Sequence, residues 1–321
     1  MRVLITGGAG FIGSNVVERC IREKFDVNVV DDLSNGHLSF LPRSVMDENL
    51  KIASFDSEAV LEDVRQKKYE AVIHLAAIPR VSYSVEHPLE SHHTNVTSTL
   101  KLLDACRGNI KRFVFASSSS VYGGADVLPT PTSAPTDPKS PYALQKLIIE
   151  KYLSMYHKHY GLDSVSLRFF NVFGPNQLGN SPYATAVSSW LTAIFSGKKM
   201  RSDGDGTQSR DMCYVDNVVD ACIKAATVPQ ALEAIPLNVA CGERNSNKQI
   251  LEYIIERFPS TEYYDSPWRP GDVMHTHADI SLTQEKIGYI PLVKFWDGLD
   301  KTIAWHQENW STIRELMHTT I

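Results

Sequence analysis

The sequence predicts an α/β protein built on a doubly wound parallel sheet. Along the first 170 residues, short apolar and β-branched runs alternate with stretches whose apolar residues have helical spacing. A glycine-rich turn also follows the first apolar run directly and precedes the first helical stretch. This alternation is typical of buried parallel strands joined by crossover helices.

The elements follow one another from the N-terminus. The run "RVLITGG" predicts a buried strand over residues 2–6, and "GFIGSNVVERCIREKF" predicts a helix with one apolar face. The run "DVNVVDD" predicts the second strand. Further strands are expected at 71–77, 112–117 and 164–170, and helices near 57–67, 89–107 and 141–160. The Pro-rich segment 128–141 predicts a loop that covers a site rather than a linker.

Length and composition set the broad class. The 321 residues can form one large domain or two unequal ones with a sizeable core. The content of 43% hydrophobic and 21% charged residues is ordinary for a soluble globular protein. The net charge of −5, with both signs mixed along the chain, predicts no nucleic-acid or membrane partner. No apolar run approaches the roughly 20 residues of a membrane span.

The cysteines and histidines predict a cytoplasmic protein without a metal site. The five cysteines are scattered without a CxxC pair, so we expect them to be reduced. The pairs His92-His93 and His275-x-His277 have no cysteine or carboxylate nearby at ligand spacing. Because a strand already occupies residues 2–6, there is no room for a signal peptide.

The turn "TGGAGFIG" predicts a dinucleotide site. Gly7, Gly10 and Gly13 have GxxGxxG spacing between a strand and a helix, where glycine lets the backbone approach a pyrophosphate. Asp31 and Asp32 end the second strand, and a carboxylate there binds the ribose hydroxyls and repels a 2′-phosphate. The motif therefore predicts NAD rather than NADP, with a purely structural glycine turn as the alternative.

The segment "SPYALQK" places Tyr142 and Lys146 four residues apart, on one face of a helix. Ser140 is suited to the N-cap and Pro141 to the first turn. A nearby ammonium favours tyrosinate, so the pair can accept a proton near neutral pH. A surface pair without function is the alternative.

Together, these motifs resemble the extended short-chain dehydrogenase/reductases. GxxGxxG, "HLAA", "SSSSVYG", Tyr142-x-x-x-Lys146 and "RFFNVFGP" occur in that family's order, and the resemblance extends to about residue 310. It implies a Rossmann domain that holds NAD and a smaller C-terminal α/β domain for a nucleotide sugar. We expect residues 1–170 to form the first domain, with part of the later chain returning to it, and residues 171–321 mainly the second.

The resemblance also implies the site residues. Tyr142 is the expected catalytic base and acid, Lys146 its partner on the nicotinamide ribose, and Ser118 shares a hydrogen bond with the reacting sugar hydroxyl. The expected cofactor-binding residues are Gly7, Gly10, Phe11, Ile12, Asp31, Asp32, Ser34, Asn35, Gly36, Asp56, Ser57, Leu75, Ala76, Ala77, Asn95, Ser117, Tyr142, Lys146 and Phe169. The expected substrate-binding residues are Ser118, Ser119, Tyr142, Asn171, Gln177, Ala186, Val187, Arg210, Arg269, Asp272 and Thr276.

The serine run Ser117–Ser120 helps to choose the reaction. Family members share a first oxidation at C4 of the sugar, whereas the 4,6-dehydratases carry Asp-Glu just after the catalytic Ser or Thr, and UDP-glucuronate decarboxylases carry a glutamate before Val-Tyr-Gly. Here these positions are Ser119 and Ser120, which cannot do that acid–base work. The resemblance therefore implies 4-epimerisation, in which the hydride returns on either face. Ser119 and Ser120 can instead serve only the backbone at the strand end.

The second half resembles the 4-epimerases that act on UDP-N-acetylhexosamines. By this resemblance, Asn171 contacts the diphosphate–sugar end, Arg210 and Arg269 hold the diphosphate, and Asp272 holds the uridine ribose. A surface ion pair of Arg210 with Asp211 is the alternative. Gln177 matches a glutamine near the sugar in members that prefer N-acetyl sugars.

Thr276 falls on the position that walls the sugar's 2-substituent in this family. Tyrosine there goes with enzymes restricted to glucose and galactose, so the smaller threonine predicts activity on UDP-GlcNAc and UDP-GalNAc, with UDP-Glc and UDP-Gal also accepted. The alternatives are a 4-epimerase that prefers UDP-glucose or UDP-glucuronate, a nucleotide-sugar reductase, and a non-catalytic NAD sensor.

The helices at 89–107 and 141–160 each carry an apolar stripe that includes Leu89, Val96, Leu147 and Met155. Core packing explains part of each stripe. In the family these helices pair across a dimer as a four-helix bundle, so the resemblance implies a homodimer.

Overall fold

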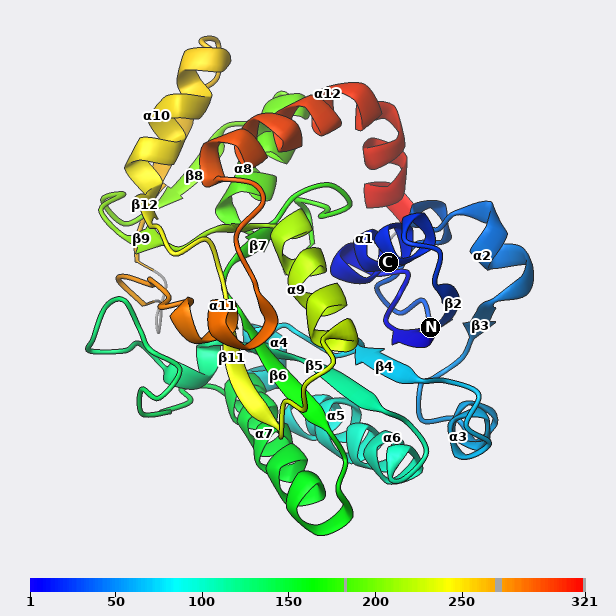
Figure 1. The fold of residues 1–321 in the computed structure, drawn as a ribbon. Helices are drawn as coiled ribbons and strands as arrows, with labels where there is room; N and C mark the ends of the chain where they lie inside the picture. The colour runs from blue at the N-terminus through cyan, green and yellow to red at the C-terminus, as the bar shows by residue number, and fades with distance from the viewer. Residues whose placement is uncertain (182–183, 269–272, 320–321) are drawn as a thin grey trace.

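The computed structural model describes residues 1–181, 184–268 and 273–319. Its centre is a parallel sheet of seven strands in the order β11-β6-β5-β4-β1-β2-β3 (Figure 1). The strand order reverses between β1 and β4, which confirms the predicted doubly wound sheet and leaves a crevice at the carboxyl ends of these strands. The strands are β1 (Arg2–Thr6), β2 (Asp26–Asp31), β3 (Leu50–Ile52), β4 (Ala71–His74), β5 (Arg112–Ser118), β6 (Ser164–Phe169) and β11 (Ile235–Val239).

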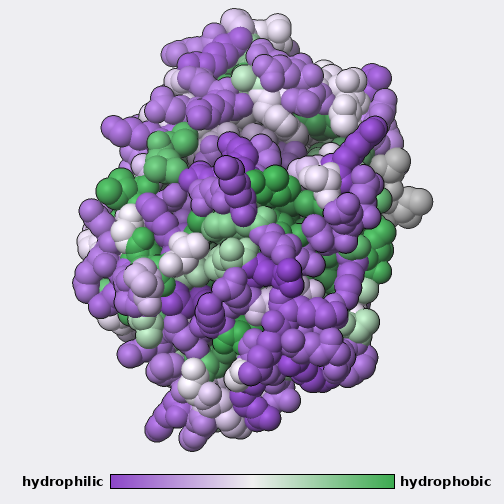
Figure 2. All heavy atoms as spheres, turned by 45° about the vertical axis from the view of Figure 1, so that its right-hand side comes forward, coloured by the Kyte–Doolittle hydropathy of each residue, from purple (hydrophilic) through white to green (hydrophobic). Residues whose placement is uncertain are grey.

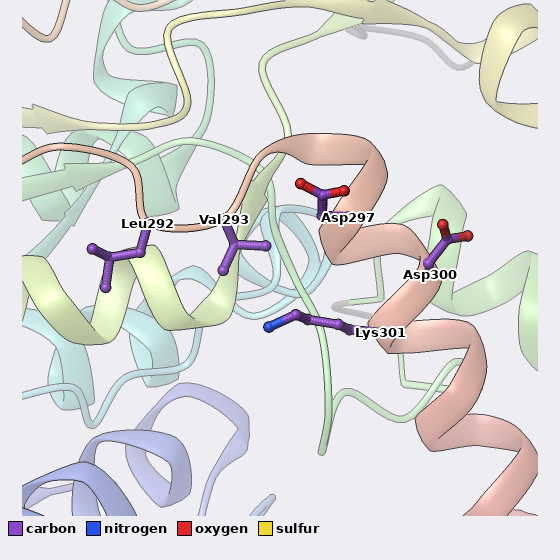
Figure 3. Close-up of a pocket in the computed structure, with 5 residues that line it drawn as sticks. All are labelled: Leu292, Val293, Asp297, Asp300 and Lys301. Atoms are coloured by element: carbon purple, nitrogen blue, oxygen red, sulfur yellow. The ribbon is translucent and has the colours of Figure 1, made fainter.

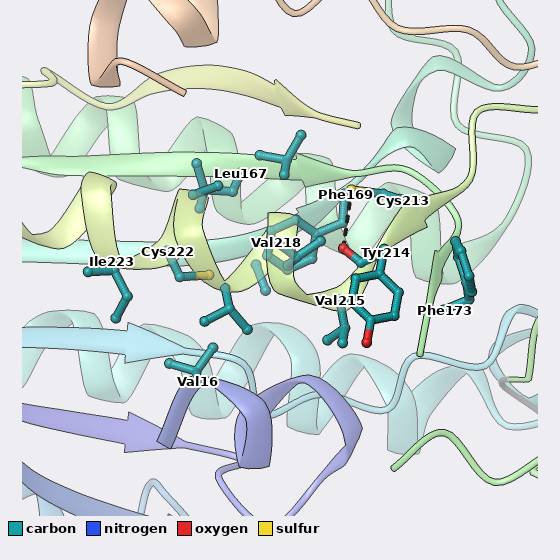
Figure 4. Close-up of a cluster of buried hydrophobic side chains, with 14 of the residues drawn as sticks. Val16, Leu167, Phe169, Phe173, Cys213, Tyr214, Val215, Val218, Cys222 and Ile223 are labelled. Carbon is teal, nitrogen blue, oxygen red and sulfur yellow. Dashed lines mark hydrogen bonds between the residues drawn. The ribbon is translucent and has the colours of Figure 1, made fainter. Parts of the chain in front are cut away.

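Helices cover both faces of this sheet because successive strand residues point to opposite sides. One face packs against α1 (Phe11–Arg22) and α9 (Val215–Thr227), and Figure 4 shows part of that core. The other face packs against α3 (Glu58–Arg65), α6 (Thr99–Cys106) and α7 (Pro141–Tyr160). Since the consecutive elements α9 and β11 both come from beyond residue 170, the later chain returns to the main sheet (Figure 1).

Helix α7 has the predicted bounds and the predicted start. The Ser140 hydroxyl accepts a hydrogen bond from the Ala143 N–H at 3.2 Å, and Pro141 occupies the first turn. Gly161 ends the helix in the left-handed region, at φ 67°. This long helix therefore holds Tyr142 at its first turn and Lys146 one turn later.

The predicted helix at 89–107 is interrupted. The structure has α5 (Pro88–His92), then a π-helical turn (His93–Ser98), then α6. The side chain of Asn95, within that turn, hydrogen-bonds the N–H and C=O of Ile78 at 2.8 and 3.0 Å. A π turn inserts one residue into the helical ladder and so re-aims a side chain. Apolar periodicity does not reveal this insertion.

The stripe on these helices is also divided between core and surface. Val96 is buried in the core, whereas Leu89 is 86% exposed. Helix α4 (Val81–Glu86) precedes α5 and adds the exposed side chains of Val81 and Val85. Core packing therefore accounts for the second half of the stripe and not for its beginning.

The remaining elements, apart from one short helix, come from beyond residue 170. Small sheets pair β10 with β7, β12 with β9, and β13 with β8. The last helix packs along α8 (Figure 1). These elements are β7 (Val172–Phe173), α8 (Ala186–Phe195), β8 (Met200–Asp203), β9 (Ser209–Arg210), β10 (Cys213–Tyr214), β12 (Asn245–Ser246), α10 (Asn247–Arg257), β13 (Tyr263–Ser266), α11 (Ser281–Ile287) and α12 (Phe295–Thr319), besides the short α2 (Arg43–Glu48). None of the helices in the described residues is long and apolar enough to cross a membrane.

Candidate functional site

The glycine turn after β1 brings backbone close to backbone. Gly7 lies in the left-handed region at φ 70°, and a Cβ there would come within 2.7 Å of the Ala76 nitrogen. A Cβ on Gly13 would come within 2.0 Å of the Gly7 carbonyl oxygen. The first turn of α1 therefore packs directly on this loop, with no acidic residue and no side-chain cap at its N-terminus. Such a helix end suits a phosphate.

Asp31 and Asp32 face the same loop at the end of β2. The Asp31 carboxylate accepts hydrogen bonds from the Ala9 and Leu33 N–H groups at 2.9 and 2.8 Å. Burial raises the pKa of Asp31, and the two backbone bonds oppose that rise. Each carboxylate oxygen of Asp31 keeps a further lone pair for a ribose hydroxyl. Asp32 accepts from the N–H and the hydroxyl of Ser34, at 2.9 and 2.6 Å.

Other predicted cofactor residues surround this turn. Leu75 and Ala76 leave the end of β4 toward Thr6, with Ala77 following, while Phe11 and Ile12 open α1. Gly36 closes the loop against Asp31, since a Cβ there would lie 2.7 Å from its Oδ1. Asn35 precedes it as an exposed residue of the same loop.

The donor and acceptor set around this loop fits a dinucleotide. The Ser57 hydroxyl at the start of α3 is buried with no hydrogen-bond partner among the described residues. Asp56 beside it stays anionic, because hydrogen bonds from Ser54, Lys101 and Ser98 outweigh its desolvation and lower its pKa to about 2. Together with the open helix end and the Asp31 lone pairs, these groups match a pyrophosphate, a ribose and a polar base.

Asn95, also predicted to bind the cofactor, bonds to the segment after β4. Besides its bonds to Ile78, it donates to the Gln145 side-chain oxygen at 2.8 Å, and its amide is buried. Its contacts join the segment after β4 to α7. Phe169, also predicted to touch the cofactor, belongs to the hydrophobic core at the end of β6.

The structure brings the three predicted catalytic residues together. Ser118 ends β5 and Tyr142 begins α7, and their hydroxyls are hydrogen-bonded. The Lys146 amine lies 5.8 Å from the centre of the Tyr142 ring and donates to the Ala116 carbonyl at 2.8 Å. The Ser84 hydroxyl of α4 also accepts from the Tyr142 N–H at 3.0 Å.

Burial dominates the electrostatics of this trio. It raises the pKa of Tyr142 to about 12, although the bond to Ser118 opposes the rise. It lowers the pKa of Lys146 to about 7, against the attraction of Glu150. The expected lowering of the Tyr142 pKa by Lys146 is therefore absent in the protein alone. Desolvation of the phenolate outweighs the attraction of the Lys146 ammonium, which points toward the Ala116 carbonyl.

The serine run divides into separate roles. Ser117 donates inward to the Glu150 carboxylate at 2.5 Å, and Ser118 faces Tyr142. Ser120 folds back and donates to the Ser118 hydroxyl from both its N–H and its side chain, at 3.2 and 2.9 Å. Ser119 stays half-buried at the start of the following 3₁₀ turn. The run is thus a turn built around the Ser118 hydroxyl.

On the other side of the crevice, Asn171 and Thr276 meet. The Asn171 side chain donates to the Thr276 hydroxyl at 3.2 Å, and so does the Asp211 N–H at 3.2 Å. Asn171 has φ 24°, in the left-handed region that asparagine tolerates better than most residues. Two segments 105 residues apart therefore join at one threonine oxygen.

Asp211 ties together the backbone segments behind the Asn171–Thr276 contact. Its buried carboxylate accepts from the N–H groups of Cys241, Gly242 and Ala278, at 2.9, 3.1 and 3.1 Å. Burial raises the pKa of Asp211 to about 7, and these bonds oppose the rise. Asp211 therefore does not act as a surface partner of Arg210, which donates to the Ser209 and Met274 carbonyls.

Other predicted substrate residues have structural contacts. The Gln177 side chain accepts from Thr185 and Ser188 and donates to the Val172 carbonyl, which fixes the start of α8. Val187 is buried in the core and Ala186 is half-buried beside it. Arg269 and Asp272 lie outside the described residues.

A buried polar network behind Ser117 was not predicted from the sequence. It consists of Glu150, Arg168, Tyr122 and Asn238. A signal for Glu150 was available: it follows Lys146 by four residues, so it lies on the same face of α7. Within the part of the chain that the structure describes, no group of three or more His, Cys, Asp or Glu side chains is placed to hold a metal ion.

A separate pocket of about 390 Å³ lies at the start of α12, between its first turns and the preceding loop (Figure 3). Its lining residues are Leu292, Val293, Asp297, Asp300 and Lys301. None of these residues was predicted to bind cofactor or substrate. Figure 2 shows one face of the molecule, which is mostly hydrophilic with apolar side chains gathered toward its middle.

Comparisons with known proteins agree with this geometry. Residues 3–240 match the model of the NAD dependent epimerase/dehydratase family. The UDP-glucose 4-epimerase of Mycolicibacterium smegmatis is 33% identical over 310 residues, which cover 94% of this chain and 97% of that protein.

Two solved structures are also similar over nearly the whole chain. The UDP-N-acetylglucosamine 4-epimerase of Methanobrevibacter ruminantium, in complex with UDP-N-acetylmuramic acid, has a TM-score of 0.89 and 38% identity, covering 96% of this chain and 98% of that one. The UDP-glucose 4-epimerase of Thermotoga maritima, with UDP-glucose, has a TM-score of 0.90 and 32% identity, covering 97% and 100%.

Proposed function

The chain belongs to the NAD-dependent epimerase/dehydratase family, and on that premise we propose that it is a UDP-sugar 4-epimerase that interconverts UDP-N-acetylglucosamine and UDP-N-acetylgalactosamine. It is an NAD-dependent enzyme. The observation that carries the choice of substrate is Thr276, a small side chain held by Asn171 and the Asp211 backbone.

NAD, when bound, supplies the acceptor and later the donor of a hydride at C4 of the sugar. Tyr142 takes the proton of the 4-hydroxyl and returns it, and Ser118 shares a hydrogen bond with that hydroxyl. Lys146 holds a positive charge beside the Tyr142 ring and binds the nicotinamide ribose. The 4-keto sugar would then rotate in the pocket, so that its other face is presented to the cofactor.

The glycine turn, Asp31 and the Asp56–Ser57 pair hold the dinucleotide in this proposal. Gly7, Gly10 and the α1 N-terminus take the pyrophosphate, and Asp31 takes the adenosine ribose. The Rossmann domain is residues 1–170 with the returning chain, and residues 171–321 mainly hold the UDP-sugar. Arg210, Arg269 and Asp272 are proposed to bind the diphosphate and uridine.

The two residues after Ser118 favour epimerisation over dehydration. Eliminating water from the sugar needs a second acid–base pair, and Ser119 and Ser120 carry no carboxylate. Ser120 is also committed to Ser118 through two hydrogen bonds. The 4-keto sugar therefore has no route other than return of its hydride.

The pocket wall predicts how substrates are sorted. The Thr276 hydroxyl receives two hydrogen bonds, so its methyl group is the part free to face a 2-acetamido group. A side chain as small as Thr276 leaves room for the 2-acetamido group and does not exclude sugars that lack it. UDP-glucose and UDP-galactose therefore remain weaker substrates. The M. smegmatis and T. maritima relatives, both named UDP-glucose 4-epimerases, support preference for the plain hexoses as the second candidate.

The test is Thr276→Tyr with Thr276→Val as the size-matched control. We expect Thr276→Tyr to lower kcat/KM for UDP-N-acetylglucosamine by more than about 100-fold and to leave UDP-glucose turnover within about tenfold. Thr276→Val keeps the size and should retain N-acetyl activity. If Thr276→Tyr keeps its activity on the N-acetyl sugar, the assigned substrate is wrong, and equal losses on both sugars would mean that the residue only supports the fold.

A homodimer completes the proposal. Helices α4, α5 and α7 contact one another and expose several apolar side chains, namely Val81, Val85, Leu89, Leu144 and Met155. Pairing these helices with a second copy would remove that apolar area from water. We place the enzyme in the cytoplasm, because a nucleotide-sugar substrate and reduced cysteines are both expected there.

A further inference from the structure

Behind the serine run, a buried polar network joins both halves of the crevice. The Glu150 carboxylate accepts from Ser117 at 2.5 Å and from two nitrogens of Arg168 at 3.0 and 2.6 Å. Arg168 donates onward to the Tyr122 hydroxyl at 2.8 Å, and Tyr122 donates to the Asn238 side chain at 2.7 Å. All five residues are at most 7% exposed. A fully connected buried network fixes its members in one arrangement.

Two residues of α7, one helical turn apart, hold two successive residues of β5. Lys146 donates to the Ala116 carbonyl, and Glu150 accepts from the next residue, Ser117. The residue after those two is Ser118. Because Tyr142 lies one turn before Lys146 on the same helix, these paired contacts set where the Tyr142 hydroxyl meets Ser118.

The network also reaches the substrate side. Arg168 donates to the Thr132 carbonyl at 3.0 Å, and Asn238 donates to the Thr130 and Asp279 carbonyls at 3.0 and 3.1 Å. Thr130 and Thr132 belong to the Pro-rich loop that leads into α7, and Asp279 follows Thr276 by three residues. Arg168 thus contacts the loop that leads to Tyr142 directly, and the network reaches the segment that carries Thr276 through Tyr122 and Asn238.

We propose that Glu150 is a positioning residue for the catalytic trio: through Ser117, Arg168 and its charge near Lys146, it fixes Ser118 against Tyr142 and keeps Lys146 protonated. The inference rests on the proposed epimerase function. Both carboxylate oxygens of Glu150 accept hydrogen bonds from Ser117 or Arg168, so its effect on the reaction is transmitted through other residues.

The charged and titratable groups around Lys146 support this role. Tyr142 and Glu150 face it from α7 and His74 from β4, while Arg168 of β6 and Tyr122 of the 3₁₀ turn face Glu150. Burial lowers the pKa of His74 to about 3, so this imidazole is neutral. Glu150 is then the anion that opposes the loss of the Lys146 proton.

The first experiment compares Ser117→Ala with Ser166→Ala. Ser166 lies on β6 opposite Phe115, and its hydroxyl is buried without a partner among the described residues, so its removal is a control for losing a hydroxyl from the same sheet. We expect Ser117→Ala to lower kcat about tenfold with KM little changed, because Ser118 shifts, and Ser166→Ala to match the wild type. Equal kcat values for the two variants would overturn the positioning role.

The second experiment follows Lys146 directly. In protein labelled at lysine, with Lys146→Met used for assignment, the NMR titration of the Lys146 side chain should move to lower pH in Glu150→Gln, because the stabilising anion is gone. Ser117→Ala keeps the anion and should keep the wild-type titration. A Lys146 titration unchanged in Glu150→Gln, with only a lower melting temperature, would show a structural role and contradict the proposal.

The two proposals fail in different ways. If the wild-type protein turned over no UDP-sugar, the proposed function would be lost, but the titration would still report whether Glu150 holds the Lys146 proton. If Glu150→Gln does not fold, Ser117→Ala alone decides the positioning role, since it removes no charge. If the wild type turns over UDP-sugar and Ser117→Ala has the same kcat as Ser166→Ala, only the inference on Glu150 is refuted.

Discussion

Burial acts in opposite directions on two neighbouring residues of α7. It raises the pKa of Tyr142 to about 12 and lowers that of Lys146 to about 7, because each neutral form avoids desolvating a charge. The difference between the pKa of Tyr142 and the pKa of Lys146 is therefore larger in the protein alone than the Tyr-x-x-x-Lys spacing suggests. Ser118 and Glu150 are the groups that narrow it, one on each member of the pair.

At the same scale, a buried histidine makes stability depend on pH. Burial lowers the pKa of His306 to about 4, so the folded protein keeps the imidazole neutral while the unfolded chain protonates it near its ordinary value of 6.5. Stability from this residue is complete above pH 6.5 and is lost as the pH falls toward 4. We expect the free energy of unfolding to fall by about 2 kcal/mol between about pH 7.5 and about pH 5 because of this residue.

His306→Phe tests this loss, since a phenyl ring can keep the stacking with Phe195 and cannot be protonated. Denaturant unfolding at the two pH values should show a loss smaller by about 2 kcal/mol in the variant. His318→Phe, at an exposed position of the same helix, should behave like the wild type. The same acid loss in His306→Phe as in the wild type would contradict the assignment.

Among the elements, the turn after β1 combines conformation and close contact. Gly7 and Gly108 have nearly the same backbone, at φ 70° and 72°, but a Cβ would meet Ala76 at 2.7 Å in the first and nothing within 4 Å in the second. We expect Gly108→Ala to cost about 1–2 kcal/mol from its left-handed backbone alone. Gly7→Ala should cost more and should also lose bound NAD.

Two measurements separate these effects: the free energy of unfolding and the NAD released when each purified variant is denatured. Gly108→Ala should release as much NAD as the wild type. If Gly7→Ala retained its NAD at the same cost in stability as Gly108→Ala, the close approach of the turn to Ala76 would have no role in cofactor binding.

The sequence was most informative for elements with strong local signals. The first parallel strands, the Ser140–Pro141 start of α7 and the glycine turn follow from periodicity and capping chemistry, and the structure has them. The π turn at His93–Ser98 has no such signal, because it arises from Asn95 bonding to Ile78 and Gln145, far away in the chain. The short strands after residue 170 depend equally on partners distant in sequence.

The site shows the same division. Tyr142 and Lys146 were predictable because their spacing places them on one helix face, and Ser118 was implied by the family resemblance. The Glu150–Arg168 pair was not, because Arg168 reaches Glu150 only through the pairing of β5 with β6. Gln177, predicted near the sugar, bonds to Thr185 and Ser188, and only tertiary packing determines these contacts.

At the scale of the whole molecule, the exposed apolar face of α4, α5 and α7 predicts a dimer that one charge should break. Val85 on α4 is 61% exposed, and Ile290, before α12, is 58% exposed. We expect Val85→Glu to sediment as a monomer, because a carboxylate would be buried in the interface, and Ile290→Glu to remain dimeric. A monomeric wild type, or a dimeric Val85→Glu, would contradict this surface as the interface.

The site draws on elements from distant parts of the sequence. Strands β5, β6 and β11 lie in the main sheet, α9 packs against it, and the polar network of Glu150 reaches the segment after Thr276 through Asn238. A site on such shared elements suits a reaction in which the cofactor stays bound while the sugar turns.

The most direct measurement is to incubate the purified protein with UDP-N-acetylglucosamine, and separately with UDP-glucose, without added cofactor, and to identify the products by proton NMR. We expect UDP-N-acetylgalactosamine from the first substrate, formed with the NAD that the protein carries, and slower formation of UDP-galactose from the second. Conversion of UDP-glucose with none of UDP-N-acetylglucosamine would contradict the role of Thr276, and conversion of neither would contradict the proposed epimerase.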